Sequence, residues 1–161
     1  ESVYAVFEIK QTLDKENMQY AQEKAESVRA LFRSSAPIQH AGGQFDPKPL
    51  HEIIAGVLAT RSSWKKPIAS NVAKYINTND HNKHLDFICS ISNNTFVVDY
   101  NTFVGQKNTI GTPSIRFCDE NNSLVFLLLT LLKRLQDIGT VPAIDYAKYA
   151  SVIDINSYKK S

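Results

Sequence analysis

The sequence lacks the marks of several specialised classes of protein. Its 18 basic and 16 acidic side chains leave a net charge of only +2, so no overall basic field points to nucleic acid, although a local basic groove is compatible with this balance. The two cysteines, Cys89 and Cys118, form no Cys-x-x-Cys pair, which favours buried free thiols in a reducing cytoplasm. The longest apolar run, residues 124–132, is interrupted by Thr130 and falls short of the roughly 20 residues that span a bilayer.

Common catalytic motifs are missing too. The chain has no Gly-x-Ser-x-Gly motif, so a hydrolase nucleophile elbow is unsupported. Residues 105–111, GQKNTIG, lack the Gly-Lys-Ser/Thr ending of a phosphate loop. His81 and His84 are three residues apart, but no cysteine or further histidine lies nearby, and solvated loop histidines are the preferred interpretation. Trp64, which has basic neighbours, is interpreted as packed on the core under an ordinary surface patch rather than as a base-stacking site.

The sequence does contain a clear succession of strands and helices. Residues 2–10 alternate with apolar side chains on both faces, which predicts a strand covered on both sides. An amphipathic helix is expected over residues 14–33, capped by Thr12 or Asp14, and residues 53–60 indicate a second, buried strand. This succession predicts a βαβ crossover with parallel strands. Further elements are expected at residues 67–77 (helix), 85–91 and 95–100 (hairpin), 115–118 (short strand), 122 or 123 to 138 (helix) and 143–150 (one or two helical turns).

The predicted fold is α/β, a mixed β-sheet flanked by helices, in a single domain over residues 1–161. The strand that contains Glu8 is expected inside the sheet, and the Gly- and Pro-rich residues 34–49 are expected to form a loop. Arg29 is expected to lie away from the apolar stripe of the first helix. Residues 124–135, apolar nearly all round, are expected to be largely buried, so that a charge at Leu128 would destabilise the domain strongly.

The residues with the clearest chemistry are Glu8 and Lys10. A Glu-x-Lys spacing on a strand places both side chains on one face, about 7 Å apart along the backbone. A carboxylate there can hold Mg²⁺, which keeps several waters, while the ammonium group positions water or stabilises charge on a phosphate. The alternative is a partly exposed ion pair, worth about 0–1 kcal/mol. The acidic-x-Lys pattern recurs in the expected loop, as Asp46-Pro47-Lys48.

A resemblance adds to this interpretation. The segment AVFEIKQTL, followed by a helix, resembles the Glu-x-Lys half of the PD-(D/E)XK nuclease superfamily, which has the restriction-endonuclease-like fold. The segments ESVYAVFEIKQTL, HAGG…KPLHEIIAGVLA and GTVPAIDYAKY are together similar to an uncharacterised bacterial domain family within that superfamily. The Gln-xxx-Tyr helix motif of the RecB-like branch is absent, although Gln19, Tyr20 and Gln22 lie on the corresponding helix.

The resemblance implies that Glu8 is a metal ligand and Lys10 the catalytic lysine, with Gln11 a weaker catalytic candidate and Mg²⁺ or Mn²⁺ as cofactor. Members of the family carry their other metal-binding Asp on the preceding strand, for which this sequence has no residues. The chain also begins on a strand without an initiator methionine. We therefore expect the C-terminal portion of a larger restriction-endonuclease-like domain, with its N-terminal part upstream.

The function implied by the resemblance is that of a cytoplasmic, metal-dependent DNA endonuclease in bacterial restriction or phage defence. Its expected partners are DNA and a protein of the defence system, and no membrane. One alternative is a nuclease-like module that binds nucleic acid or a partner protein without cutting. Another is a structural α/β domain whose helices serve assembly.

Overall fold

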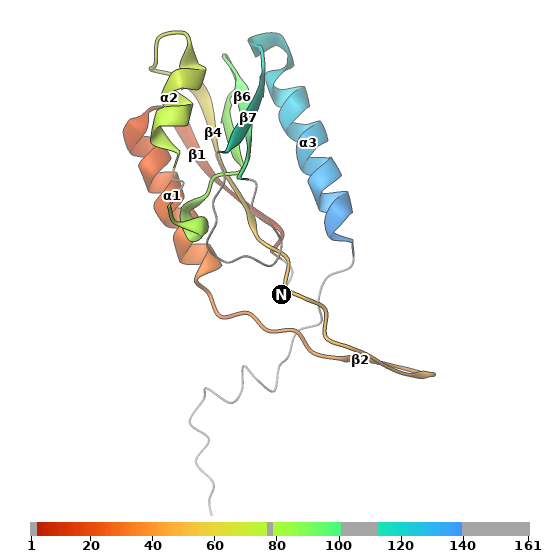
Figure 1. The fold of residues 1–161 in the computed structure, drawn as a ribbon. Helices are drawn as coiled ribbons and strands as arrows, with labels where there is room; N and C mark the ends of the chain where they lie inside the picture. The colour runs from red at the N-terminus through yellow and green to blue at the C-terminus, as the bar shows by residue number, and fades with distance from the viewer. Residues whose placement is uncertain (1–2, 77–78, 101–112, 140–161) are drawn as a thin grey trace, which may run out of the picture. The chain divides into compact units, whose positions relative to one another are not determined.

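The computed structural model describes residues 3–76, 79–100 and 113–139 (Figure 1). The chain divides into two compact units, a larger one of residues 3–31 and 52–137 and a smaller one that includes residues 32–51. The larger unit contains a five-stranded mixed sheet in the order β1-β4-β5-β6-β7. Its strands are β1 (Ala5–Leu13), β4 (Ile54–Ser62), β5 (Phe87–Ser90), β6 (Thr95–Asp99) and β7 (Ser114–Cys118).

The predicted crossover is present. Strand β1 runs parallel to β4, from Ala5 opposite Ile54 to Leu13 opposite Ser62, and the first helix lies between them in the chain. Strand β5 is parallel to β4, whereas β6 and β7 are antiparallel to their neighbours. The α/β fold class with a mixed sheet is therefore confirmed.

The prediction that β1 lies inside the sheet is wrong for the residues that the structure describes. There β1 is the edge strand, with β4 as its one partner in the sheet. The prediction that both of its faces are covered is wrong as well, because the side chain of Ile9 is 64% exposed. Apolar residues on both faces of a strand in the sequence therefore did not show that other elements cover both faces.

Two helices cover the face of the sheet that carries Glu8. Helix α1 (Lys15–Arg29) starts at Asp14, whose Oδ1 accepts a hydrogen bond from Asn17 N at 2.8 Å, and it ends four residues before the predicted limit. Helix α2 (Ile68–Tyr75) lies beside it (Figure 1). Trp64 stacks on Tyr75 and packs against this core, as predicted. The core between helices and sheet includes Met18, Ala21, Ala25, Ala55, Val57, Ile68, Val72, Ile88 and Phe96.

Helix α3 (Ser123–Ile138) lies on the other face of the sheet (Figure 1). Its bounds agree with the prediction, and Gly139 follows it with a φ of 66°, a conformation that favours glycine. The prediction that residues 124–135 are largely buried is wrong. Ser123 and Leu127 are its buried residues, whereas the sheet leaves exposed the side chains of Leu124, Val125, Leu128, Leu129 and Leu132.

The smaller unit contains a hairpin where the sequence predicts a loop. Strand β2 (Ile38–His40) pairs antiparallel with β3 (Gly43–Phe45), and the ring of His40 stacks on that of Phe45. Gly43 adopts a φ of 138°, which the turn requires and which side chains rarely allow. Two short 3₁₀ helices complete the described elements, η1 (His81–Lys83) and η2 (Glu120–Asn122). Within the described ranges, none of the helices has the length and apolar character needed to cross a membrane.

Candidate active site

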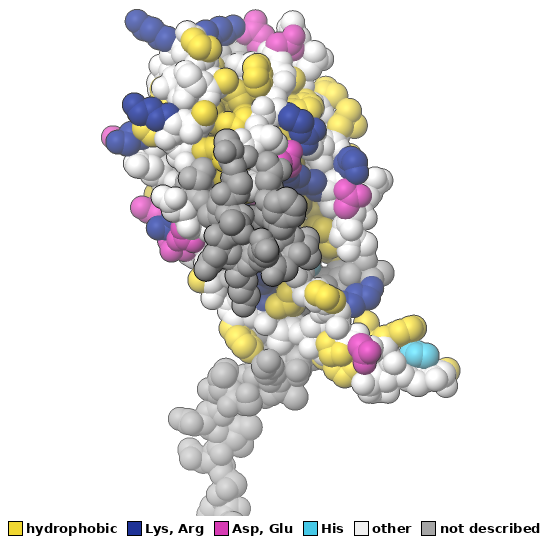
Figure 2. All heavy atoms as spheres, in the orientation of Figure 1, with side chains coloured by type: hydrophobic (Ala, Val, Ile, Leu, Met, Phe, Trp, Pro, Cys, Tyr) yellow, Lys and Arg dark blue, Asp and Glu magenta, His cyan; other side chains and the backbone are white. Residues whose placement is uncertain are grey.

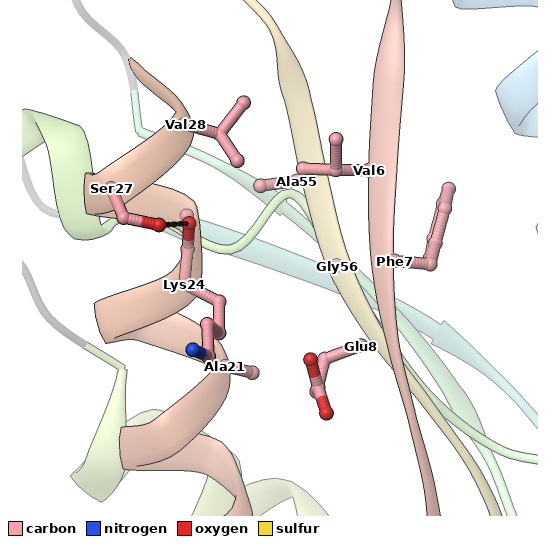
Figure 3. Close-up of a pocket in the computed structure, with 10 residues that line it drawn as sticks. Val6, Phe7, Glu8, Ala21, Lys24, Ser27, Val28, Ala55 and Gly56 are labelled. Carbon is pink, nitrogen blue, oxygen red and sulfur yellow. Dashed lines mark hydrogen bonds between the residues drawn. The ribbon is translucent and has the colours of Figure 1, made fainter. Parts of the chain in front are cut away.

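Glu8 and Lys10 meet at the surface of β1. Lys10 Nζ lies 3.0 Å from Glu8 Oε1, and each side chain is about one quarter exposed, 25% for Glu8 and 27% for Lys10. Alternation along β1 turns both toward α1, and Figure 3 shows the Glu8 carboxylate directed from the strand toward that helix. The pair therefore combines a carboxylate and an ammonium group that remain accessible to solvent.

The pairing of β1 with β4 holds this pair in place. Glu8 stands opposite Val57, whose side chain is fully buried in the core. The strand pairing therefore fixes the backbone of Glu8, while the Glu8 side chain stays partly exposed. At the preceding position Phe7 stands opposite Gly56. A Cβ on Gly56 would lie 2.6 Å from the Phe7 ring and 2.8 Å from the carbonyl oxygen of Phe87, so only glycine fits this close approach.

An open pocket of about 220 Å³ lies between β1 and α1 (Figure 3). Glu8 and Lys24 are its charged lining residues, and Figure 3 shows the Lys24 side chain running along α1, with its nitrogen close to the helix. The remaining lining is small or apolar and comes from Val6, Phe7, Ala21, Ala25, Ser27, Val28, Ala55 and Gly56. The pocket thus presents one negative and one positive group to a polar ligand.

The ring of Tyr20 connects the strand and helix sides of this site. Lys10 Nζ lies 4.1 Å from the centre of the Tyr20 ring, and Lys24 Nζ lies 4.9 Å from it. Both distances are within the range of a cation–π attraction. The sequence placed Tyr20 on this helix without assigning it a contact, although its spacing of four residues from Lys24 shows that the two share a face.

The other residue predicted for the site, and the residues that repeat its acidic-x-Lys pattern, lie elsewhere. Gln11 is exposed, and alternation along β1 places its side chain on the face opposite Lys10. Asp46 and Lys48 belong to the smaller unit. Within the described part of the chain, no three His, Cys, Asp or Glu residues come together in a way that would hold a metal ion. Glu8 thus supplies one carboxylate that could coordinate a cation. Of the residues predicted for the site, the fold brings Glu8 and Lys10 together.

A second polar cluster lies at the end of α1 and was not predicted from the sequence. Arg29, expected on the open side of the helix, is only 8% exposed, and it donates hydrogen bonds to the carbonyl oxygens of Ile53, Asn82 and His84. Its Nη2 also lies 3.0 Å from Asp86 Oδ2. The other oxygen of Asp86 accepts a hydrogen bond from Arg134 Nη1 at 2.8 Å.

The interpretation of the histidines as solvated is wrong for His84. Its side chain is buried, and its ring stacks on Tyr100 with centroids 3.6 Å apart. The Nε2 atom has no hydrogen-bond partner among the residues that the structure describes. Burial, with smaller contributions from the charges of His81 and Arg29, lowers the pKa of His84 to about 4. His84 also lines a separate polar pocket of about 300 Å³, next to Asp86 and Arg134.

Fold and site together define an α/β domain with an accessible Glu-x-Lys pair on a strand that pairs in parallel and packs against a helix. No family model matches the sequence. Comparison with curated proteins finds two endodeoxyribonucleases named NucC. The one from Pseudomonas aeruginosa is 39% identical over 149 residues, and the one from Escherichia coli (strain MS 115-1) is 38% identical over 149 residues.

Solved structures give the same result. The cAAA-bound form of the P. aeruginosa NucC superimposes with a TM-score of 0.77 at 38% identity, and the apo form of the E. coli NucC with 0.75 at 36%. Each match covers 92% of this chain, which spans 58% of the length of the two curated relatives. The chain is therefore homologous to endodeoxyribonucleases and shares their fold. The relatives found are named nucleases, which corrects the expectation of an uncharacterised family.

Proposed function

We propose that this chain is the part of a metal-dependent DNA endonuclease that carries the Glu-x-Lys half of its active site. The observation that supports this most directly is the Glu8–Lys10 pair, with its polar atoms 3.0 Å apart beside an open pocket. A surface ion pair alone would have no such implication. Its position in a chain 38–39% identical to two endodeoxyribonucleases favours the catalytic interpretation.

The chemistry follows from the two side chains. Glu8 would hold Mg²⁺ or Mn²⁺, which supplies a Lewis acid for the phosphate and lowers the pKa of bound water. Lys10 would donate hydrogen bonds to the attacking water and to the phosphate oxygens as negative charge develops there. The water oxygen forms a bond to phosphorus, the phosphorus–oxygen bond to the leaving strand end breaks, and that oxygen takes up a proton. The substrate is DNA, and the reaction is hydrolysis of a phosphodiester.

Two further elements extend this proposal. One relative was solved with cAAA bound, so we propose that the full-length protein also binds a cyclic oligoadenylate. We also propose a role in bacterial phage defence, in the cytoplasm, and keep Gln11 as a weaker catalytic candidate. Acidic and basic side chains alternate on the face shown in Figure 2, so DNA contact would come from a local arrangement of lysines rather than from a basic field.

The test uses full-length protein on DNA with Mg²⁺, Mn²⁺ or EDTA, each with and without cAAA. We expect metal-dependent cutting by the wild type and a loss of at least about 100-fold in Glu8→Gln, because the amide keeps the shape but not the charge of a metal ligand. Lys10→Ala should lose most of its turnover with a smaller effect on metal binding. Asp46→Asn and Lys48→Ala are the control variants, since they remove a carboxylate and an ammonium group with the same spacing in the smaller unit.

The outcomes distinguish an endonuclease from the alternative functions. Cutting that survives Glu8→Gln would remove Glu8 from the site. A wild type that binds DNA without cutting it under every condition would favour the non-cutting binding module. Circular dichroism of each variant checks that the fold is kept.

A further inference from the structure

The charges around the Tyr20 ring do not cancel. Lys10 is paired with Glu8, but Lys24 has no carboxylate partner at ion-pair distance among the described residues. Both ammonium groups nevertheless lie within 5 Å of the centre of one aromatic ring. Glu8, Lys10 and Lys24 together leave one excess positive charge beside the open pocket. This excess favours an anionic ligand at the pocket.

A cation on Glu8 would also weaken the attraction between Glu8 and Lys10 in the proposed reaction. The ammonium group of Lys10 could then move with its long side chain. The Tyr20 ring offers a second attachment, because the negative face of an aromatic ring attracts an ammonium group. The N–H donors that point away from the ring remain available to water and phosphate.

We infer that α1 supplies a second half of the site, in which Tyr20 is a positioning residue for Lys10 and Lys24 binds a phosphate of the DNA backbone. The inference rests on the proposed function. Tyr20 acts through Lys10, whereas Lys24 contacts the substrate from the opposite wall of the pocket that Glu8 faces (Figure 3). The ring face of Tyr20, and not its hydroxyl group, performs this role.

The experiment compares two substitutions of the tyrosine in full-length protein. Tyr20→Leu removes the ring and should lower kcat about 3- to 30-fold with little change in KM, as expected for the loss of one cation–π attraction. Tyr20→Phe keeps the ring and should retain most of the wild-type kcat. Equal losses of kcat in both variants would show that the hydroxyl group matters, and an unchanged kcat in Tyr20→Leu would show that the ring does not. Either result overturns the role assigned to Tyr20.

A second measurement does not depend on cutting. The ring current of Tyr20 should shift the NMR signals of the Lys10 methylene protons next to Nζ, which can be measured without metal. The shift should vanish in Tyr20→Leu and persist in Tyr20→Phe. A Lys10 signal that is the same in Tyr20→Leu and the wild type would contradict the contact itself.

Lys24 is tested by DNA binding in EDTA, where no cutting occurs. Lys24→Gln should weaken binding and reduce the slope of log affinity against log salt by about 1, the signature of one lost phosphate contact. Lys74→Gln is the matched control, because Lys74 Nζ lies 5.3 Å from the ring of Tyr75 but outside the pocket of Glu8. An equal salt dependence in Lys24→Gln and the control would refute the phosphate contact.

Different results would overturn the proposed function and the roles of Tyr20 and Lys24. If Glu8→Gln cuts DNA like the wild type, the proposed function fails whatever Tyr20 does. If Glu8→Gln is inactive while Tyr20→Leu and Lys24→Gln match the wild type in every measurement, the proposed function stands and the inference about α1 fails.

Discussion

Replacing Arg29 by methionine should be among the most destabilising single substitutions in the larger unit. The guanidinium group donates to Ile53 O from Nε and Nη2 at 3.0 and 2.8 Å, and to His84 O from Nη1 at 2.6 Å. It also contacts Asp86 at 3.0 Å. These bonds connect the end of α1 to the residue before β4 and to the segment before β5. Methionine keeps the apolar stem but leaves several acceptors without their donor.

The expected loss of stability depends on the groups that lose their hydrogen bonds to Arg29. Removing one partner of a buried charged pair typically costs about 3–5 kcal/mol. Asp86 keeps Arg134 Nη1 at 2.8 Å and the backbone N–H of Ala55 at 2.9 Å, so its charge stays compensated. The cost then comes mainly from the buried carbonyl groups, which lose bonds to a charged donor. We therefore expect the lower part of the range, about 3 kcal/mol.

The assay is urea unfolding followed by circular dichroism, with hydrogen exchange of residues 81–84 as a local readout. Arg116→Met is the matched control, because Arg116 pairs with Asp99 at 3.3 Å on exposed β7 and should cost less than about 1 kcal/mol. A cost of less than about 1 kcal/mol for Arg29→Met as well would contradict the stabilising role of these hydrogen bonds. A double-mutant cycle with Asp86→Asn then measures how much of the cost belongs to the ion pair.

Two further predictions concern burial. His84 has a pKa of about 4 in the folded protein and an ordinary value near 6.5 when unfolded, so the unfolded chain binds the proton first as pH falls. Stability should therefore decrease between pH 6.5 and 4 by up to about 3 kcal/mol, and the fall should be smaller in His84→Phe when urea unfolding is measured across that range. On α3, Leu127 is 4% and Leu128 is 48% exposed. Leu127→Lys should cost about 3 kcal/mol or more, whereas Leu128→Lys should change urea unfolding by less than about 1 kcal/mol; equal effects would contradict the assignment of the buried side.

The α3 case shows what the sequence could and could not reveal. The start near Ser123 and the end at Gly139 were predicted, because the sequence signals for helix ends are local. Burial is not local. An apolar run that covers all sides of a helix contains no information about which side faces the sheet, and here the sheet covers mainly Leu127.

The same distinction explains the edge position of β1. Its alternation was visible, since side chains on a strand repeat every two residues, and its parallel pairing with β4 followed from the βαβ pattern. Whether another strand pairs with its free side depends on the rest of the sheet. Arg29 was misplaced for a related reason: a long side chain near the end of a helix can turn inward when distant carbonyl groups are available to accept its hydrogen bonds.

The candidate site depends both on local sequence features and on contacts between distant parts of the chain. Glu8 and Lys10 were identified because their spacing on one strand is local, whereas Tyr20 and Lys24 approach them only through the crossing of α1 over β1. That crossing is fixed at two points. Asn17 donates from Nδ2 to the carbonyl oxygen of Thr12 on β1 near the start of the helix, and Arg29 attaches the end of the helix to the segments before β4 and β5. Tyr20 and Lys24 lie between these points, so Arg29 contributes to the placement of both residues beside the Glu8–Lys10 pair.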